Sequence, residues 1–100
     1  MTLPVKKMMP LEEVVIGLVF NEDGELLIDQ RLESSSMGGL WEFPGGKKKS
    51  DESIKSAIER EIKEELGIAI KVGEMLLSFE HSYSQKKIFF TVHICEWQSG

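Results

Sequence analysis

The sequence is poor in cysteine and has no long apolar run. Cys95 is the single cysteine among 100 residues, so no internal disulfide can form, as is typical of a reducing compartment. Cys95 lies in an apolar, strand-like stretch, which predicts a packed side chain rather than a nucleophile. The longest apolar run, Val14–Phe20, is far shorter than the ~20 residues that span a bilayer. No signal-peptide-like run follows the N-terminal lysines. We therefore predict a cytoplasmic protein without membrane contact.

Basic residues and histidines are also scarce. Twelve basic against seventeen acidic side chains give 12 − 17 = −5, which disfavours a generic DNA binder because neutralising phosphates needs clustered lysine and arginine. A nucleotide held through a metal ion is still allowed, since the ion brings its own positive charge. His81 and His93 are the only histidines, fewer than the three or four ligands of a zinc site. The length is that of one globular domain.

The N-terminal half predicts a tail followed by short strands. Residues 1–10 contain two prolines and no periodicity and are interpreted as a tail or linker, with one domain over residues 11–100. A hairpin is expected from two apolar segments flanking a glycine-containing turn. The expected segments are a strand at Val14–Phe20, a turn at Asn21–Gly24, a strand at Glu25–Ile28, a loop at Ser34–Gly39 and a short strand at Leu40–Phe43.

The C-terminal half predicts one helix and two strands. Ser50 or Asp51 is expected to cap a helix that ends at Leu66, with Gly67 as its stop. An apolar residue at every fourth position gives this helix a buried stripe: Ile54, Ile58, Ile62 and Leu66. Strands are expected at Ile68–Ser78 and Lys86–Trp97. The order β-β-β-α-β-β predicts an α+β or mixed α/β domain.

The predicted helix carries a crowded acidic face. Glu61, Glu64 and Glu65 fall within an arc of roughly 100°. Like charges this close destabilise a helix, so a cation is expected beside them, and carboxylate oxygens suit Mg²⁺ or Mn²⁺. The competing interpretation is a solvated acidic surface.

The residues just before the helix favour the metal interpretation. Pro44-Gly45-Gly46 predicts a tight turn where backbone can approach a ligand closely. Lys47 follows, placed to meet phosphate oxygens. A polyphosphate held between this turn, the lysine and carboxylate-bound metal ions would form a coherent site.

These residues resemble the Nudix box over Gly46–Ile68. Gly46 is followed after five residues by Glu52 and, after seven more, by Arg60-Glu61-Ile62-Lys63-Glu64-Glu65-Leu66-Gly67-Ile68. All nine constrained positions of the box match over 23 residues. The resemblance implies an α/β/α sandwich on a mixed sheet. It also implies attack by water on a phosphorus of a nucleoside diphosphate linked to another moiety.

The resemblance also implies residue roles. The metal ligands would be Glu61, Glu64 and Glu65, with the backbone carbonyl of Gly45 as a further candidate. Arg60 would orient the catalytic glutamates, the alternative being an exposed pair with Glu64. Glu52 would support the junction between loop and helix, or the water shell of the metal, near the substrate.

The flanking stretch Gly39–Lys47 resembles the MutT branch of the family. Such enzymes hydrolyse 8-oxo-dGTP to 8-oxo-dGMP and pyrophosphate, which implies this substrate or a related nucleoside triphosphate. Trp41 and Phe43 would supply apolar surface near the base, the alternative being core packing. Arg31 matches a nucleotide-contacting position, although a surface ion pair is the competing interpretation.

A second resemblance is to the MutT-like C-terminal domain of MutY adenine glycosylases. It rests on Leu3–Lys6, on Met37–Trp41 and on His81–Ser84, and it implies recognition of 8-oxoguanine in DNA with His81 on the lesion side. The glycosylase domain is missing and the box is intact, so catalysis remains the leading interpretation. This non-catalytic module is the alternative, and a catalytically feeble remnant is a third.

The sequence departs from the family in length. MutT-like domains continue for roughly 30 residues beyond the strand that ends near Trp97, and that segment brings a loop glutamate, a last strand and a closing helix. We therefore expect either a shortened domain or a partner that completes it. An exposed sheet edge would favour self-association as a homodimer.

Overall fold

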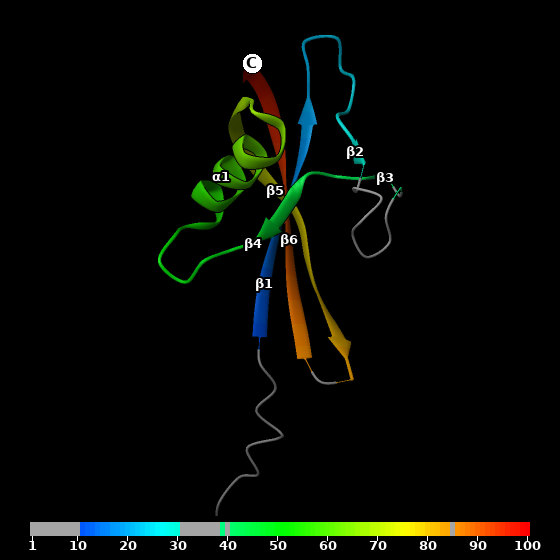
Figure 1. Cartoon of the computed structure of the whole chain (residues 1–100), viewed down its shortest axis with the longest axis vertical. Helices are drawn as coiled ribbons and strands as arrows, with labels where there is room; N and C mark the ends of the chain where they lie inside the picture. Colours follow the sequence, from blue (N-terminus) through cyan, green and yellow to red (C-terminus); the bar gives the residue numbers. More distant parts are fainter. Residues whose placement is uncertain (1–10, 31–38, 40, 85) are drawn as a thin grey trace, which may run out of the picture.

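The computed structural model describes residues 11–30, 39, 41–84 and 86–100 (Figure 1). A mixed four-stranded sheet in the order β4-β1-β6-β5 forms its centre, and β2 and β3 form a separate two-stranded ribbon. One helix, α1, lies against one face of the larger sheet. The elements are β1 (Leu11–Phe20), β2 (Asp29–Gln30), β3 (Trp41–Glu42), β4 (Gly45–Lys47), α1 (Ile54–Leu66), β5 (Ala69–Tyr83) and β6 (Lys86–Ser99).

This architecture confirms the predicted mixed α and β fold. Strand β1 pairs in parallel with β6 and antiparallel with β4, and β5 pairs antiparallel with β6. Within the described ranges α1 is the only helix, so they hold one helical layer of the sandwich that the resemblance implies. No helix among the described residues is long and apolar enough to cross a membrane.

The core forms where the apolar stripe of α1 meets β1. Ile58 and Ile62 are fully buried against Val15 and Val19, as the four-residue repeat predicts. Burying each such side chain contributes about 1.5–3 kcal/mol. Cys95, 1% exposed, joins this core as expected. The buried stripe therefore anchors α1 on the sheet, where the helix packs against β1 and β4.

The two ends of α1 differ in how well the sequence predicts them. The expected caps Ser50 and Asp51 are wrong: Ser53 is the N-cap, and its side-chain oxygen accepts a hydrogen bond from the Ser56 amide at 3.1 Å. Gly67 ends the helix as predicted, in the left-handed conformation with φ 69°. Its amide donates to the Lys63 carbonyl at 2.9 Å, as in many helix stops.

The predicted hairpin is only partly formed. The turn after β1 is present, and the Asn21 side chain accepts hydrogen bonds from the amides of Asp23 and Glu25. The expected strand at Glu25–Ile28 is wrong, because this segment makes one isolated bridge, between Leu26 and Phe20. Regular pairing begins only at β2, which aligns with β3. The short strand expected around Trp41 is confirmed.

The last two strands are longer than expected. Strand β5 continues past the expected end at Ser78 to Tyr83 and so includes His81. His81 packs edge-on against Tyr83, with ring centroids 4.5 Å apart. The expected tail at residues 1–10 lies outside the described residues, and the domain boundary stays a prediction.

Candidate active site

The glycine pair before the helix forms an edge strand. The tight turn predicted at Pro44-Gly45-Gly46 is wrong: Gly45 pairs with Ile16 and Gly46 with Val15 in the β4–β1 ladder. A Cβ atom on Gly45 would lie 2.9 Å from the Ile16 Cα and closer still to the Val15 carbonyl oxygen. Only glycine lets the two backbones approach this closely.

Gly46 leaves room for a carboxylate of the helix. A Cβ atom at this position would lie 2.5 Å from Cδ and 2.8 Å from Oε1 of Glu61. The Glu61 carboxylate therefore rests directly on the bare backbone of Gly46. In this way the glycine connects the sheet edge to the acidic face of α1.

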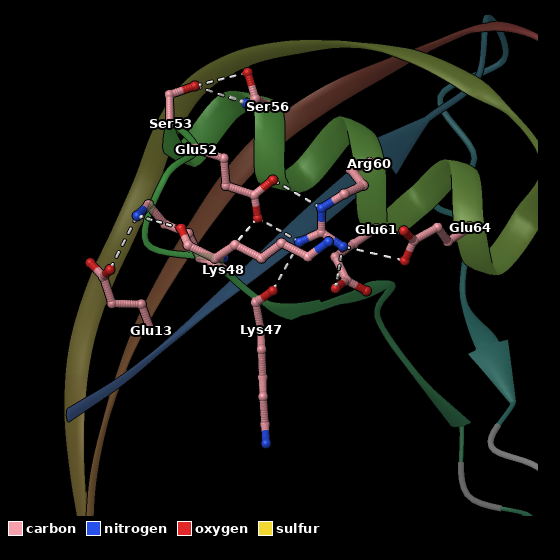
Figure 2. A network of polar contacts seen from close by, with 10 residues as sticks. Glu13, Lys47, Lys48, Glu52, Ser53, Ser56, Arg60, Glu61 and Glu64 are labelled. Carbon is pink, nitrogen blue, oxygen red and sulfur yellow. Dashed lines mark hydrogen bonds and ion pairs between the residues drawn. The ribbon is translucent and has the colours of Figure 1, made fainter. Parts of the chain in front are cut away.

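Arg60 is the centre of a polar network over this junction (Figure 2). Its guanidinium donates two hydrogen bonds to Glu52, one of them from Nε to Oε2 at 2.9 Å. Further bonds reach Glu61 at 3.0 Å, Glu64 at 3.3 Å and the Lys47 carbonyl at 3.0 Å. A planar fork with five donors suits such multiple pairing. Arg60 therefore holds Glu61 and also makes the exposed pair with Glu64, so both of its predicted interactions are present.

Glu52 is anchored at the junction between loop and helix. Its side chain is 14% exposed and also accepts a hydrogen bond from the Lys49 amide at 2.8 Å. The hydrogen bonds from Arg60, and then that from Lys49, lower the pKa of Glu52 to about 2. The pKa of Arg60 is raised further, first by its hydrogen bonds to Glu52. Both groups therefore stay charged over the physiological range.

Glu65 lies beside Gly45, one helical turn after Glu61. Burial of its carboxyl group raises its pKa to about 7, and a hydrogen bond with the Gly45 backbone offsets part of this shift. Negative charge on Glu61, Asp29 and Glu42 raises the pKa further. Because the residue as a whole stays exposed, solvent screening moderates the energetic effect. The site thus concentrates negative charge close to the glycine pair.

The donor chemistry here fits a hard divalent cation. Glu61 and Glu65 both reach the Gly45–Gly46 backbone, and carboxylate and carbonyl oxygens are the ligands that Mg²⁺ and Mn²⁺ prefer. Glu64, with a side chain 58% exposed, leans toward Arg60 instead. Within the described part of the chain, no three acidic, histidine or cysteine side chains already converge on one point. The carboxylates would have to close around an ion.

Lys47 is oriented differently from expectation. Its ammonium group points away from the glutamates of α1 (Figure 2). It pairs instead with Glu12 on β1 at 3.5 Å. What Lys47 gives the glutamate network is its carbonyl, which accepts from Arg60. Its side chain is 73% exposed, and the predicted phosphate contact stays a prediction.

A pocket of about 410 Å³ opens next to the glycine pair. Trp41 and Phe43, both expected near the base, line it together with Phe90. The remaining lining residues are Val14, Ile16, Glu42, Gly45 and Gly46. Because Val14 and Ile16 alternate with the buried Val15, the pocket lies on the sheet face opposite α1. It combines apolar walls with a backbone edge that leads to the glutamates.

His81 does not line this pocket, and Arg31 falls outside the described residues. The sequence interpretation in turn missed Phe90, Asp29 and Glu42. The alternation of side chains along the predicted strand Lys86–Trp97 could have placed Phe90 on one face of the sheet. Its neighbours on that face depend on the register of strand pairing, which the sequence does not give. The acidic pair is formed by the pairing of β2 with β3, where Asp29 faces Glu42.

The fold and site together define a domain whose glutamate-bearing helix faces a glycine strand beside an aromatic pocket. Residues 15–100 match the NUDIX domain. The CTP pyrophosphohydrolase of Escherichia coli strain K12 is 40% identical over 83 residues, which are 83% of this chain and 58% of that protein. The 8-oxo-dGTP diphosphatase of Haemophilus influenzae is 37% identical over 86 residues, 85% and 63% of the two chains.

The same likeness extends to three dimensions. The crystal structure of the MutT protein from Methanosarcina mazei Go1 superimposes with a TM-score of 0.75 at 32% identity, covering 92% of this chain and 71% of that one. This chain belongs to the Nudix family, as the box predicts. It spans less than two thirds of the length of the two sequence relatives.

Proposed function

We propose that this protein is a divalent-metal-dependent pyrophosphohydrolase that converts 8-oxo-dGTP, or a related nucleoside triphosphate, to the monophosphate and pyrophosphate. The observation that supports this most is the meeting of Glu61 and Glu65 with the Gly45–Gly46 strand beside the aromatic pocket. Phosphate chemistry would then take place on the face of the sheet that carries α1, and the base would bind on the opposite face, with the Gly45–Gly46 strand between them.

The positions of the residues suit different roles in this reaction. Glu61, Glu64 and Glu65, with the Gly45 carbonyl, would hold Mg²⁺ or Mn²⁺. Bound there, the cation would supply Lewis-acid stabilisation of charge on the phosphates. Arg60 orients the Glu61 carboxylate, and Glu52 fixes Arg60 in turn. In the reaction a water oxygen bonds to a phosphorus of the triphosphate as the bridging P–O bond between the α- and β-phosphates breaks, which releases the monophosphate and pyrophosphate. The water protons pass to solvent or to a carboxylate.

The pocket supplies a place for the base. Trp41, Phe43 and Phe90 offer ring surfaces on which a planar base can stack. The named activities of the two relatives differ in the base, one acting on CTP and the other on 8-oxo-dGTP. We place 8-oxo-dGTP first because the stretch Gly39–Lys47 resembles the MutT branch, and CTP is the second candidate.

A substrate screen on the whole chain tests this proposal. Pyrophosphate release is measured with Mg²⁺ for 8-oxo-dGTP, dGTP and CTP, using the wild type, Glu64→Gln and Glu59→Gln. Glu59 is an exposed glutamate on the same helix, so its variant is the matched control. Glu64→Gln should lose at least ~100-fold, because even groups that orient a metal ligand are worth about 10- to 100-fold.

Three results would count against the proposal. Equal turnover by the two variants would exclude a role for Glu64. Absence of any pyrophosphate release would exclude the enzyme. If the inactive protein also bound an 8-oxoguanine·adenine duplex tightly, the interpretation as a non-catalytic recognition module would replace the interpretation as an enzyme.

A further inference from the structure

A second aromatic ring supports the pocket from outside. Phe90 lines the pocket, and its ring is stacked on Phe79 of β5, with centroids 4.8 Å apart and planes 16° from parallel. Phe79 is 46% exposed and is not one of the lining residues. The edge strand β5 therefore reaches the pocket through one ring-to-ring contact.

The stack depends on irregularities in β5. Two extra residues interrupt its pairing with β6 between Val72 and Leu77. Val72 is paired with Cys95 before them, and Phe79 is paired with Phe90 after them. Without these bulges, Leu77 would face Phe90 and no aromatic pair would form. β-bulges commonly re-aim a side chain in this way.

Gly73 allows β5 to lie close to β6 at the bulges. A Cβ atom there would lie 2.9 Å from the Ile94 carbonyl oxygen of β6. The Gly73 carbonyl is also held by the ring of His93, at 2.9 Å from Nδ1. The register that delivers Phe79 to Phe90 is thus built into the backbone of the two strands.

We propose that Phe79 is a positioning residue that fixes the Phe90 ring as one wall of a site for a planar heteroaromatic base. The inference rests on the proposed function for the identity of the ligand. A ring free to turn offers its face to a base only part of the time, whereas a stacked ring offers it continuously. Aromatic pairs contribute about 0.5–1.5 kcal/mol, so loss of the stack should weaken base binding ~2- to 12-fold.

Binding measurements separate this inference from turnover. Calorimetric dissociation constants for 8-oxo-dGMP and for base-free deoxyribose 5-phosphate are compared in the wild type, Phe79→Leu, Phe79→Tyr and Leu77→Ala. Phe79→Leu keeps apolar bulk without the ring, and Phe79→Tyr restores the ring. Leu77 is similarly exposed, at 45%, and neither it nor its partner Val92 lines the pocket, so its variant is the control.

The expected pattern is selective. Phe79→Leu should weaken the binding of 8-oxo-dGMP by roughly 2- to 12-fold and leave the binding of deoxyribose 5-phosphate unchanged. Phe79→Tyr should recover wild-type affinity for 8-oxo-dGMP. If the enzyme turns over, the KM for 8-oxo-dGTP should rise more than kcat falls. Equal weakening of both ligands, or an equal effect of Leu77→Ala, would overturn the inference. Selective base binding without any turnover would support it while removing the proposed activity.

Discussion

Adding a single methyl group at Gly46 should separate catalysis from folding. In Gly46→Ala the new Cβ would lie 2.5 Å from Cδ and 2.8 Å from Oε1 of Glu61. Carbon atoms without a bond between them need about 3.5 Å, so the carboxylate must retreat by roughly 1 Å. The terminal atoms of a flexible side chain can move this far at a cost of about 1 kcal/mol. A misplacement of ~1 Å at a reacting centre costs on the order of 10²-fold in rate.

Gly45→Ala supplies the contrast. Its Cβ would meet the backbone of β1, including the Ile16 Cα at 2.9 Å, and backbone in a paired strand cannot step aside. We expect Gly45→Ala to lose about 2–3 kcal/mol of unfolding free energy, and Gly46→Ala to lose only about 1 kcal/mol while kcat falls. Urea unfolding and steady-state kinetics with Mg²⁺ measure both. A folded Gly46→Ala with wild-type kcat would refute the reasoning about Glu61.

Three further predictions concern charge. The folded-state pKa of Glu52, about 2 against an ordinary 4.5, means that its contribution to stability is complete above about pH 4.5 and is lost as the pH falls toward 2. Glu52→Gln should therefore flatten the pH dependence of urea unfolding in that window, and an unchanged slope would contradict the shift. Arg60→Lys should lower kcat roughly 10- to 100-fold because an ammonium cannot span Glu52 and Glu61 together, and full activity would argue against the orienting role. Removal of divalent metal by EDTA should abolish turnover, and Mg²⁺ at 100 times its dissociation constant should add about 2.7 kcal/mol of stability. Thermal unfolding would show that gain, and Glu65→Gln should reduce it.

Local chemistry explains which features were predictable. The stripe of α1 and its stop at Gly67 depend on neighbouring residues only, and both are confirmed. The start of the helix was misplaced because Ser50, Asp51 and Ser53 are all able caps. The choice among them depends on the position of the first helical turn over the sheet.

Features that depend on distant pairing were missed. A proline followed by two glycines predicts a turn, yet both glycines belong to strand β4, where Gly45 lies closer to the backbone of β1 than a Cβ atom would allow. Likewise, the box identifies Arg60 and the glutamates, but not the direction of Lys47, whose ammonium group pairs with Glu12 on another strand. The register of β5 depends on its bulges, so neither the strand position of His81 nor the aromatic stack could be anticipated.

The parallel pairing of β1 with β6 has a kinetic consequence. Leu11 pairs with Lys87 and Phe20 with Glu96, so the two central strands of the sheet are the first and the last of the described strands. Non-local pairing of this kind slows folding because the entropy of closing a long loop is lost before contacts compensate for it. During synthesis on the ribosome, β1 would have no main pairing partner until β6 emerges. We therefore expect slow refolding and a need for protection of β1 during synthesis.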